Sequence, residues 1–77
     1  MVLITTEPLI MASFTVYILY SQKLDRYYTG YSENPELRLV QHNQGISVYT
    51  SKANDWIIVY REAFSTRQAA QRREREN

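Results

Sequence analysis

Hydrophobic and polar residues follow the clearest pattern in the first third of the chain. The stretch FTVYILY, residues 14–20, consists of β-branched and aromatic residues, which favour a strand. Alternation places Tyr17 and Leu19 on one face of this strand, and Val16 and Ile18 on the other. Because both faces are largely apolar, we expect the strand to lie at the centre of a sheet rather than at its edge.

Two further strands follow the same rule of composition. RYYTGY, residues 26–31, comes after the turn SQKLD and is expected to pair back on the first strand as an antiparallel hairpin. Within it, Tyr28 and Gly30 share one face. WIIVYRE, residues 56–62, is nearly continuous in large apolar residues and predicts the third strand.

The segment ENPELRLVQHNQG, residues 33–45, carries the signals of a helix at both ends. Asn34 is a good N-cap, Pro35 occupies the first helical position, and Gly45 closes the helix. These three signals predict a helix between the second and third strands.

The side chains of this helix divide between two expected faces. Leu37 and Val40 are expected to form its buried stripe, with Leu39 as a less certain member. Arg38 and His42 are four residues apart, so both project from one face.

The last segment, STRQAAQRREREN at residues 65–77, predicts a second helix. Ser65 and Gln68 have the spacing of a capping box, and the apolar residues of the segment are Ala69 and Ala70. The order of elements is therefore β–β–α–β–α. It predicts a small α/β (α+β) domain, with one helix on each face of the sheet or both helices flanking it.

Composition excludes several kinds of site. A chain of 77 residues forms at most one domain. It has no cysteine, which excludes disulfides and thiolate metal sites, and His42 is its one histidine, which excludes a multi-histidine metal site. A net charge of +1 does not by itself indicate nucleic acid, and on charge alone the arginines after Phe64 are best interpreted as a solvated helix face.

The N-terminal segment MVLITTEPLIMAS, residues 1–13, is interpreted as an added leader, with a short segment packed on the core as the alternative. It has neither the basic start of a signal peptide nor an unbroken apolar run of membrane-spanning length. We therefore expect a cytoplasmic protein without a membrane partner, whose domain occupies residues 14–77.

Five residues suggest chemistry: Tyr17, Tyr28, Arg38, His42 and Glu74. Each has a plain structural explanation, as a strand tyrosine, a solvent-facing helix residue or a member of a salt-bridge lattice. If the first two strands pair, however, both tyrosines share a sheet face, and a neighbouring glycine would let a phosphodiester approach. A base, a cation and a carboxylate for a divalent metal fit hydrolysis at phosphorus.

The motifs that carry these residues resemble those of the GIY-YIG nuclease family, in particular its small bacterial single-domain members. The motifs are VYI at 16–18, YTG at 28–30, NPELRLVQH at 34–42 and RRE at 72–74. The resemblance covers about residues 14–76. It implies a three-stranded antiparallel sheet flanked by helices.

The resemblance also implies a role for each of the five residues. Tyr17 matches the tyrosine of the first motif, and Tyr28 that of the second. Arg38 matches the arginine that stabilises the scissile phosphate, and His42 matches a position that is histidine in many members. Glu74 matches the single metal-binding glutamate, which normally holds magnesium or manganese (Mg²⁺ or Mn²⁺).

The reaction implied is one-metal hydrolysis of phosphodiester bonds in DNA, with Tyr17 or His42 as the general base. His42 is the easier proton acceptor on intrinsic grounds, because a free histidine has a pKa of about 6.5 and a free tyrosine about 10. The substrate is expected to be branched, nicked or damaged duplex, cut with structural or weak selectivity, and the oligomeric state stays open. The residues expected to contact DNA are Arg38, Tyr49, Lys52, Arg72 and Arg73.

The chain departs from the family pattern in two places. The first motif is Val-Tyr-Ile rather than Gly-Ile-Tyr, which is interpreted as a tolerated variant because the tyrosine is present. The second departure supports other interpretations, because the chain ends before the lysine-bearing turn with which relatives continue. The domain is thus C-terminally short, and Asn77 is not a convincing substitute for an asparagine that some members use. The alternatives are a non-catalytic nucleic-acid-binding module on the same fold and a truncated, inactive nuclease.

Overall fold

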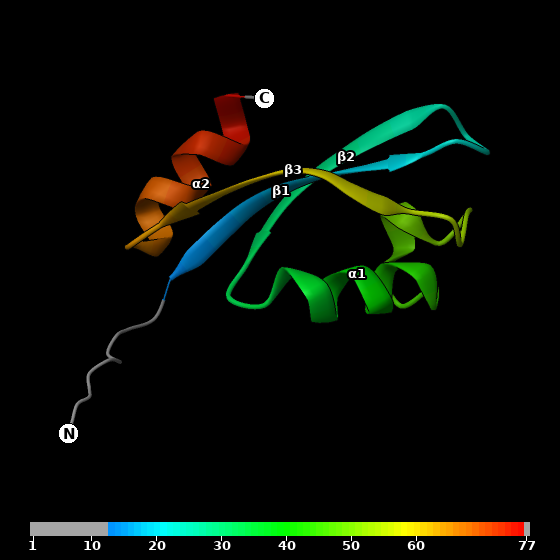
Figure 1. Cartoon of the computed structure of the whole chain (residues 1–77), viewed down its shortest axis with the longest axis horizontal. Coiled ribbons are helices and arrows are strands. Elements are labelled where there is room, and N and C mark those ends of the chain that lie inside the picture. Colours follow the sequence, from blue (N-terminus) through cyan, green and yellow to red (C-terminus); the bar gives the residue numbers. More distant parts are fainter. Residues whose placement is uncertain (1–12, 77) are drawn as a thin grey trace, which may run out of the picture.

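A computed structural model describes residues 13–76 and shows the predicted element order (Figure 1). The three strands form one antiparallel sheet with two helices, so the predicted α+β fold is confirmed. The N-terminal segment 1–12 and Asn77 lie outside the described residues. The elements are β1 (Phe14–Ser21), β2 (Arg26–Ser32), α1 (Pro35–Asn43), the short 3₁₀ helix η2 (Val48–Thr50), β3 (Ile57–Phe64) and α2 (Arg67–Glu76).

The strand β1 lies in the middle of the sheet, whose order is β2–β1–β3. Tyr17 is opposite Gly30 of β2 on one side and Arg61 of β3 on the other. The central position predicted from its two apolar faces is therefore confirmed. β3 is an edge strand, and this explains why its apolar side chains Ile57 and Val59 remain about half exposed.

The two helices lie on opposite faces of the sheet (Figure 1). α1 covers the face that carries Tyr17 and Leu19. α2 lies toward the other end on the opposite face, where Gln71 donates a hydrogen bond from Nε2 to Tyr31 Oη at 2.9 Å. No helix among residues 13–76 is long and apolar enough to cross a membrane.

The first helix begins as its sequence predicts but buries a different face. Asn34 Oδ1 accepts a hydrogen bond from Leu37 N at 3.1 Å, which confirms the N-cap. The expected buried stripe is wrong: Leu37 and Val40 are 51% and 50% exposed. The inward face instead carries His42, which is fully buried, because both of its ring nitrogens find hydrogen-bond partners there.

The N-cap of the second helix lies one residue later than the predicted capping box. Thr66 Oγ1 accepts the hydrogen bond from Ala69 N at 3.1 Å, so Thr66, not Ser65, is the cap. Ala70 is the one buried residue of α2. The helix is otherwise held by polar contacts, such as the Arg73–Glu62 pair at 3.0 Å.

The core lies between the sheet and the segment that joins α1 to β3. It consists of Tyr17, Leu19, Ala53 and Trp56, with Tyr28 and three aliphatic side chains packed against it. Trp56 precedes β3 rather than opening it. The Asn43 side chain fixes the tryptophan backbone in both directions, accepting from Trp56 N at 2.8 Å and donating to Trp56 O at 3.0 Å.

Candidate active site

The centre of the candidate site is a contact between a strand tyrosine and the helix histidine. Tyr17 Oη lies 3.1 Å from His42 Nε2. The tyrosine is fixed by the central strand β1, and the histidine by the last turn of α1. Both side chains are buried, with exposed fractions of 1% and 0%, so the contact is shielded from bulk water.

Thr50, in η2, contacts the other ring nitrogen of this histidine. Its Oγ1 lies 2.6 Å from His42 Nδ1, and the Thr50 side chain is fully buried. The Thr50 carbonyl accepts a hydrogen bond from Trp56 Nε1 at 2.9 Å, which anchors the turn to the core. Thr50 is not among the candidate site residues predicted from the sequence. The signal was indirect, because a buried imidazole needs a partner for each ring nitrogen.

Gly30 was expected to let a phosphodiester approach the sheet, but in the structure it makes room for the Tyr17 ring. A Cβ atom at this position would lie 2.8 Å from Tyr17 Oη and 2.9 Å from Tyr17 Cζ. The space left by the missing side chain is therefore filled by the Tyr17 phenol, not kept open for a phosphodiester. Gly30 positions the tyrosine by letting its ring lie across β2.

Tyr28 joins the buried pair to the surface. Its ring centroid is 5.0 Å from that of His42 and 5.5 Å from that of Tyr49. Tyr28 is half-buried, whereas Tyr49 is 78% exposed. The two motif tyrosines, Tyr17 and Tyr28, thus meet the same histidine, as expected for residues that share a sheet face.

Arg38 supplies the positive charge beside this pair. Its Nη1 donates to Gln41 Oε1 at 2.6 Å. Burial raises the pKa of Tyr17, and a hydrogen bond from Arg38 opposes that rise. Burial, followed by the positive charge of Arg38, lowers the pKa of His42 below its ordinary value. His42 is therefore neutral at pH 7, and Tyr17 keeps its proton.

Glu74 lies on α2, across the sheet from α1, and its charge acts on both motif tyrosines. The pKa values of Tyr17 and Tyr28 are raised chiefly by burial, and the negative charge of Glu74 raises both further. Among residues 13–76 no group of three acidic, histidine or cysteine side chains could enclose a metal ion. A lone carboxylate still suits Mg²⁺, which keeps several waters and commonly binds one or two carboxylates together with substrate phosphates.

The residues expected to contact DNA lie in different environments. Tyr49, Lys52 and Arg72 are exposed, while Arg38 is half-buried beside Tyr17. Arg73 is used within the protein, where it pairs with Glu62 at 3.0 Å and Glu76 at 3.4 Å. DNA contact stays a prediction for all five, and the ion pairs make Arg73 the weakest candidate.

The remaining strand tyrosines have structural contacts. Tyr20 donates to Asp25 Oδ1 at 2.9 Å, and Tyr60 donates to Glu62 Oε1 at 2.7 Å. The Tyr20 ring also packs against Tyr27, with centroids 4.9 Å apart. Only Tyr17 and Tyr28 of the strand tyrosines described in residues 13–76 contact the buried histidine in this structure.

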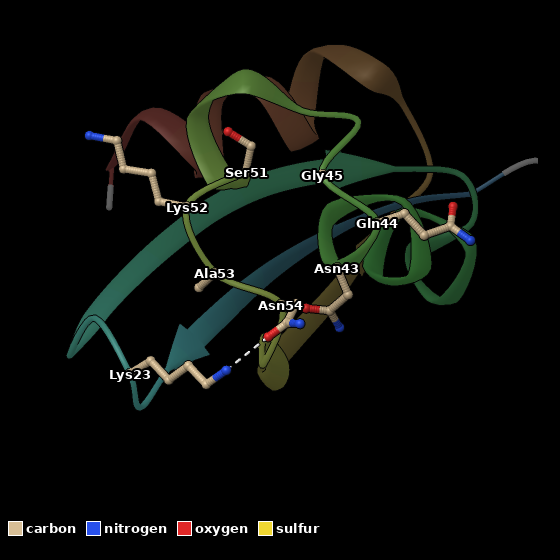
Figure 2. Close-up of a pocket in the computed structure, with 8 residues that line it drawn as sticks. All are labelled: Lys23, Asn43, Gln44, Gly45, Ser51, Lys52, Ala53 and Asn54. Atoms are coloured by element: carbon tan, nitrogen blue, oxygen red, sulfur yellow. Dashed lines mark hydrogen bonds between the residues drawn. The ribbon is translucent and has the colours of Figure 1, made fainter.

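A polar hollow of about 330 Å³ lies beside the turn that links β1 and β2 (Figure 2). Lys23 extends across it and donates from Nζ to Asn54 Oδ1 at 3.0 Å, while Lys52 points away from that pair. Its other lining residues include Asn43 and Gly45 at the end of α1. No acidic or histidine side chain lines this hollow, and its charged side chains are Lys23 and Lys52.

Comparison with known proteins assigns the same region to one family. A family model described as the GIY-YIG catalytic domain matches residues 13–77. The UPF0213 protein SH2523 of Staphylococcus haemolyticus (strain JCSC1435) is 42% identical over 67 residues, which are 86% of this chain and 80% of that protein. No solved structure matches the chain.

Proposed function

Since the chain belongs to the GIY-YIG family, we propose that it is a metal-dependent endonuclease that hydrolyses phosphodiester bonds in DNA. The observation that carries this proposal is the buried Tyr17–His42 contact, with Arg38 beside it and Glu74 within electrostatic reach. Family membership supports a nucleic-acid substrate. The side chains support the chemistry, because they combine a proton acceptor, a cation and a carboxylate.

In the proposed mechanism, Tyr17 and His42 handle the proton together. His42 is fully buried, so the group through which it exchanges a proton is the Tyr17 phenol 3.1 Å away. When Nδ1 of the neutral imidazole donates to Thr50 Oγ1, Nε2 is left as an acceptor for the phenol proton. The Tyr17 oxygen then accepts a proton from the attacking water. In this arrangement His42 takes the phenol proton, and Tyr17 takes the proton of the attacking water.

Arg38 and Tyr28 act on the phosphate in this proposal. The Arg38 guanidinium lies close enough to Tyr17 to oppose the rise that burial causes in its pKa, and its free N–H groups can bind the developing negative charge at phosphorus. Tyr28 is half-buried beside the same histidine, where its hydroxyl can orient a phosphate oxygen. Both side chains hold the phosphate near the tip of Tyr17.

Glu74 would hold the divalent cation, Mg²⁺ or Mn²⁺. When bound, such a cation supplies a Lewis acid at the phosphoryl oxygen and lowers the pKa of a coordinated water. The Glu74 carboxylate would be the protein ligand of that cation. In the metal-free protein, burial raises the pKa of both tyrosines, and the charge of Glu74 raises it further.

A second candidate is a nucleic-acid-binding module without catalysis. The observation that favours it is burial: Tyr17 is 1% exposed, and burial raises its pKa. A phenol in that setting is a weak base unless bound substrate and cation favour its anion. This candidate predicts salt-sensitive DNA binding with no cleavage.

The deciding experiment is nicking of supercoiled plasmid with Mg²⁺ or Mn²⁺. We expect the wild-type chain to nick, and Glu74→Gln and Tyr17→Phe to lose nicking. Glu76→Gln is the matched control, because Glu76 is an exposed carboxylate on the same helix and its ion pair with Arg73 is long, at 3.4 Å. Loss of nicking in the control as well would show a damaged helix rather than a lost ligand.

Two results would overturn the nuclease proposal. One is wild-type protein that binds plasmid but never nicks it with either metal, which supports the binding module. The other is nicking that survives both Glu74→Gln and Tyr17→Phe, which would point to a contaminating nuclease.

A further inference from the structure

A second hollow, here called the aromatic hollow, lies between the β1–β2 turn and η2, next to the candidate active site. It encloses about 480 Å³, within the range of small-molecule sites in proteins. Its apolar and aromatic lining consists of Leu24, Tyr27, Tyr28, Val48, Tyr49 and Trp56. None of the roles derived for the hydrolytic site uses this space.

The aromatic hollow has a buried floor and an exposed rim. Trp56 is 4% exposed and belongs to the core, whereas Tyr49 is 78% exposed and Val48 88% exposed. The rings of Tyr28 and Tyr49 are tilted by 56° rather than stacked on each other. A face of Tyr49 is therefore left in water beside an apolar floor, where a flat ligand can stack on it.

The charges around the aromatic hollow are all positive. Lys23, Arg26 and Lys52 line it, and no acidic side chain does. None of the three forms an ion pair with any of residues 13–76, although Lys23 Nζ donates a hydrogen bond to Asn54. Aromatic rings set among cations without ion pairs are the combination with which proteins bind single-stranded nucleic acid.

One ring connects this hollow to the candidate active site. Tyr28 contacts His42 on one side, with centroids 5.0 Å apart, and Tyr49 on the other at 5.5 Å. A nucleotide whose phosphate lies at Arg38 can therefore place its base, or that of its neighbour, on Tyr49. The cations of the rim would meet the adjoining phosphates.

We propose that the aromatic hollow binds an unpaired nucleobase next to the scissile phosphate, which selects DNA with single-stranded character. This inference rests on the proposed function, because it names the substrate class of the same site. A base inside a duplex is stacked and paired, so it must be extruded at a cost of a few kcal/mol before it can enter, and least for a base already unpaired. Flaps, gaps and junctions present such a base without that cost.

The test is equilibrium binding in EDTA, where no cleavage occurs. Fluorescence anisotropy is measured with three labelled oligonucleotides of equal length: oligo-dT, the same strand made of abasic tetrahydrofuran units, and a blunt duplex. We expect oligo-dT to bind more tightly than both others. Tyr49→Ala should weaken oligo-dT binding about 5- to 150-fold, the value of one stacked base, and leave the abasic strand unaffected.

Two further variants separate stacking from charge. Tyr60→Ala is the matched control: Tyr60 is another partly exposed tyrosine, on β3 and outside the aromatic hollow, and its loss should leave oligo-dT binding unchanged. Lys52→Gln should reduce the slope of log affinity against log salt by about 0.7, the value for one phosphate contact on a single strand.

Failure here is distinguishable from failure of the nuclease proposal. Equal affinity for oligo-dT and the abasic strand, or equal losses in Tyr49→Ala and Tyr60→Ala, would overturn the base site, whatever the plasmid shows. A preference for oligo-dT that depends on Tyr49, together with an absence of nicking, would confirm the base site and refute the hydrolytic role. Circular dichroism of each variant checks that it is folded.

Discussion

Replacement of Gly30 by alanine tests how the candidate catalytic tyrosine is positioned. The backbone of Gly30 has no positive φ angle, so alanine itself is compatible with the strand. The added Cβ, however, would lie 2.8 Å from Tyr17 Oη and 2.9 Å from Tyr17 Cζ, closer than carbon atoms approach in proteins. The ring cannot move away freely, because it is 1% exposed and its hydroxyl contacts His42.

The size of the effect follows from this geometry. Overpacking of a filled core costs about 1–3 kcal/mol. In a domain of 60–100 residues each kcal/mol lowers Tm by about 4–8 °C. We therefore expect Gly30→Ala to be clearly destabilising in urea and thermal unfolding followed by circular dichroism.

The sign of the effect should reverse when the tyrosine ring is removed. In a Tyr17→Leu background the two shortest contacts are gone, and only the 3.1 Å approach to Tyr28 Cε2 is left. Alanine is otherwise better than glycine inside a strand by roughly 0.5–1 kcal/mol. All four proteins of this double-mutant cycle are measured in the same concentration of trimethylamine N-oxide, which keeps weakened variants folded. If Gly30→Ala is neutral in the wild-type protein, or costs the same in both backgrounds, the positioning role of Gly30 is refuted.

Three other predictions concern the residues around the site. Burial and Arg38 lower the pKa of His42 in the folded state, so its contribution to stability is complete above the unfolded pKa of about 6.5 and is lost as pH falls below it. The free energy of unfolding should fall by up to about 1.4 kcal/mol per pH unit. Urea midpoints from pH 8 to 5 should show this slope, and His42→Gln should flatten it. Asn43→Ala should lower the free energy of unfolding by about 1–3 kcal/mol, because it leaves the backbone N–H and C=O of Trp56 without partners. Asn54→Ala removes one exposed contact and should change that free energy by no more than about 0.5 kcal/mol. Urea midpoints compare the two variants. Thr66→Ala should lower the free energy of unfolding by about 0.5–2 kcal/mol, because α2 loses its N-cap, and Ser65→Ala should be near neutral in the same assay. The opposite ranking would show that Ser65 is the cap, as the sequence predicts.

The parts of the fold that sequence predicts well are those set by local signals. Asn34, Pro35 and Gly45 mark α1 because capping chemistry depends on neighbouring backbone atoms alone. The central position of β1 follows from a pattern that is apolar on both faces. Local signals compete where two caps are adjacent, and there Thr66 rather than Ser65 accepts the helix hydrogen bond.

The parts that sequence misses depend on contacts between distant residues. Leu37 and Val40 are more apolar than His42, yet the histidine is the buried residue, because Tyr17 and Thr50 satisfy its ring nitrogens. Thr50 lies in a segment whose composition predicts only a polar loop. Its role emerges when the η2 turn is packed between the histidine and the tryptophan.

If Glu74 holds the cation as proposed, the division of the site between two helices makes function less robust than the fold. The Tyr17–His42 pair is built into the core, whereas Glu74 is carried by α2, whose one buried residue is Ala70. Such a helix can open by itself at a free energy well below that of global unfolding. Each opening would remove the carboxylate while the sheet and its tyrosines stay native. Hydrogen exchange should then show α2 amides exchanging faster than those of β1, and the temperature at which activity is lost should lie below the melting temperature of the sheet.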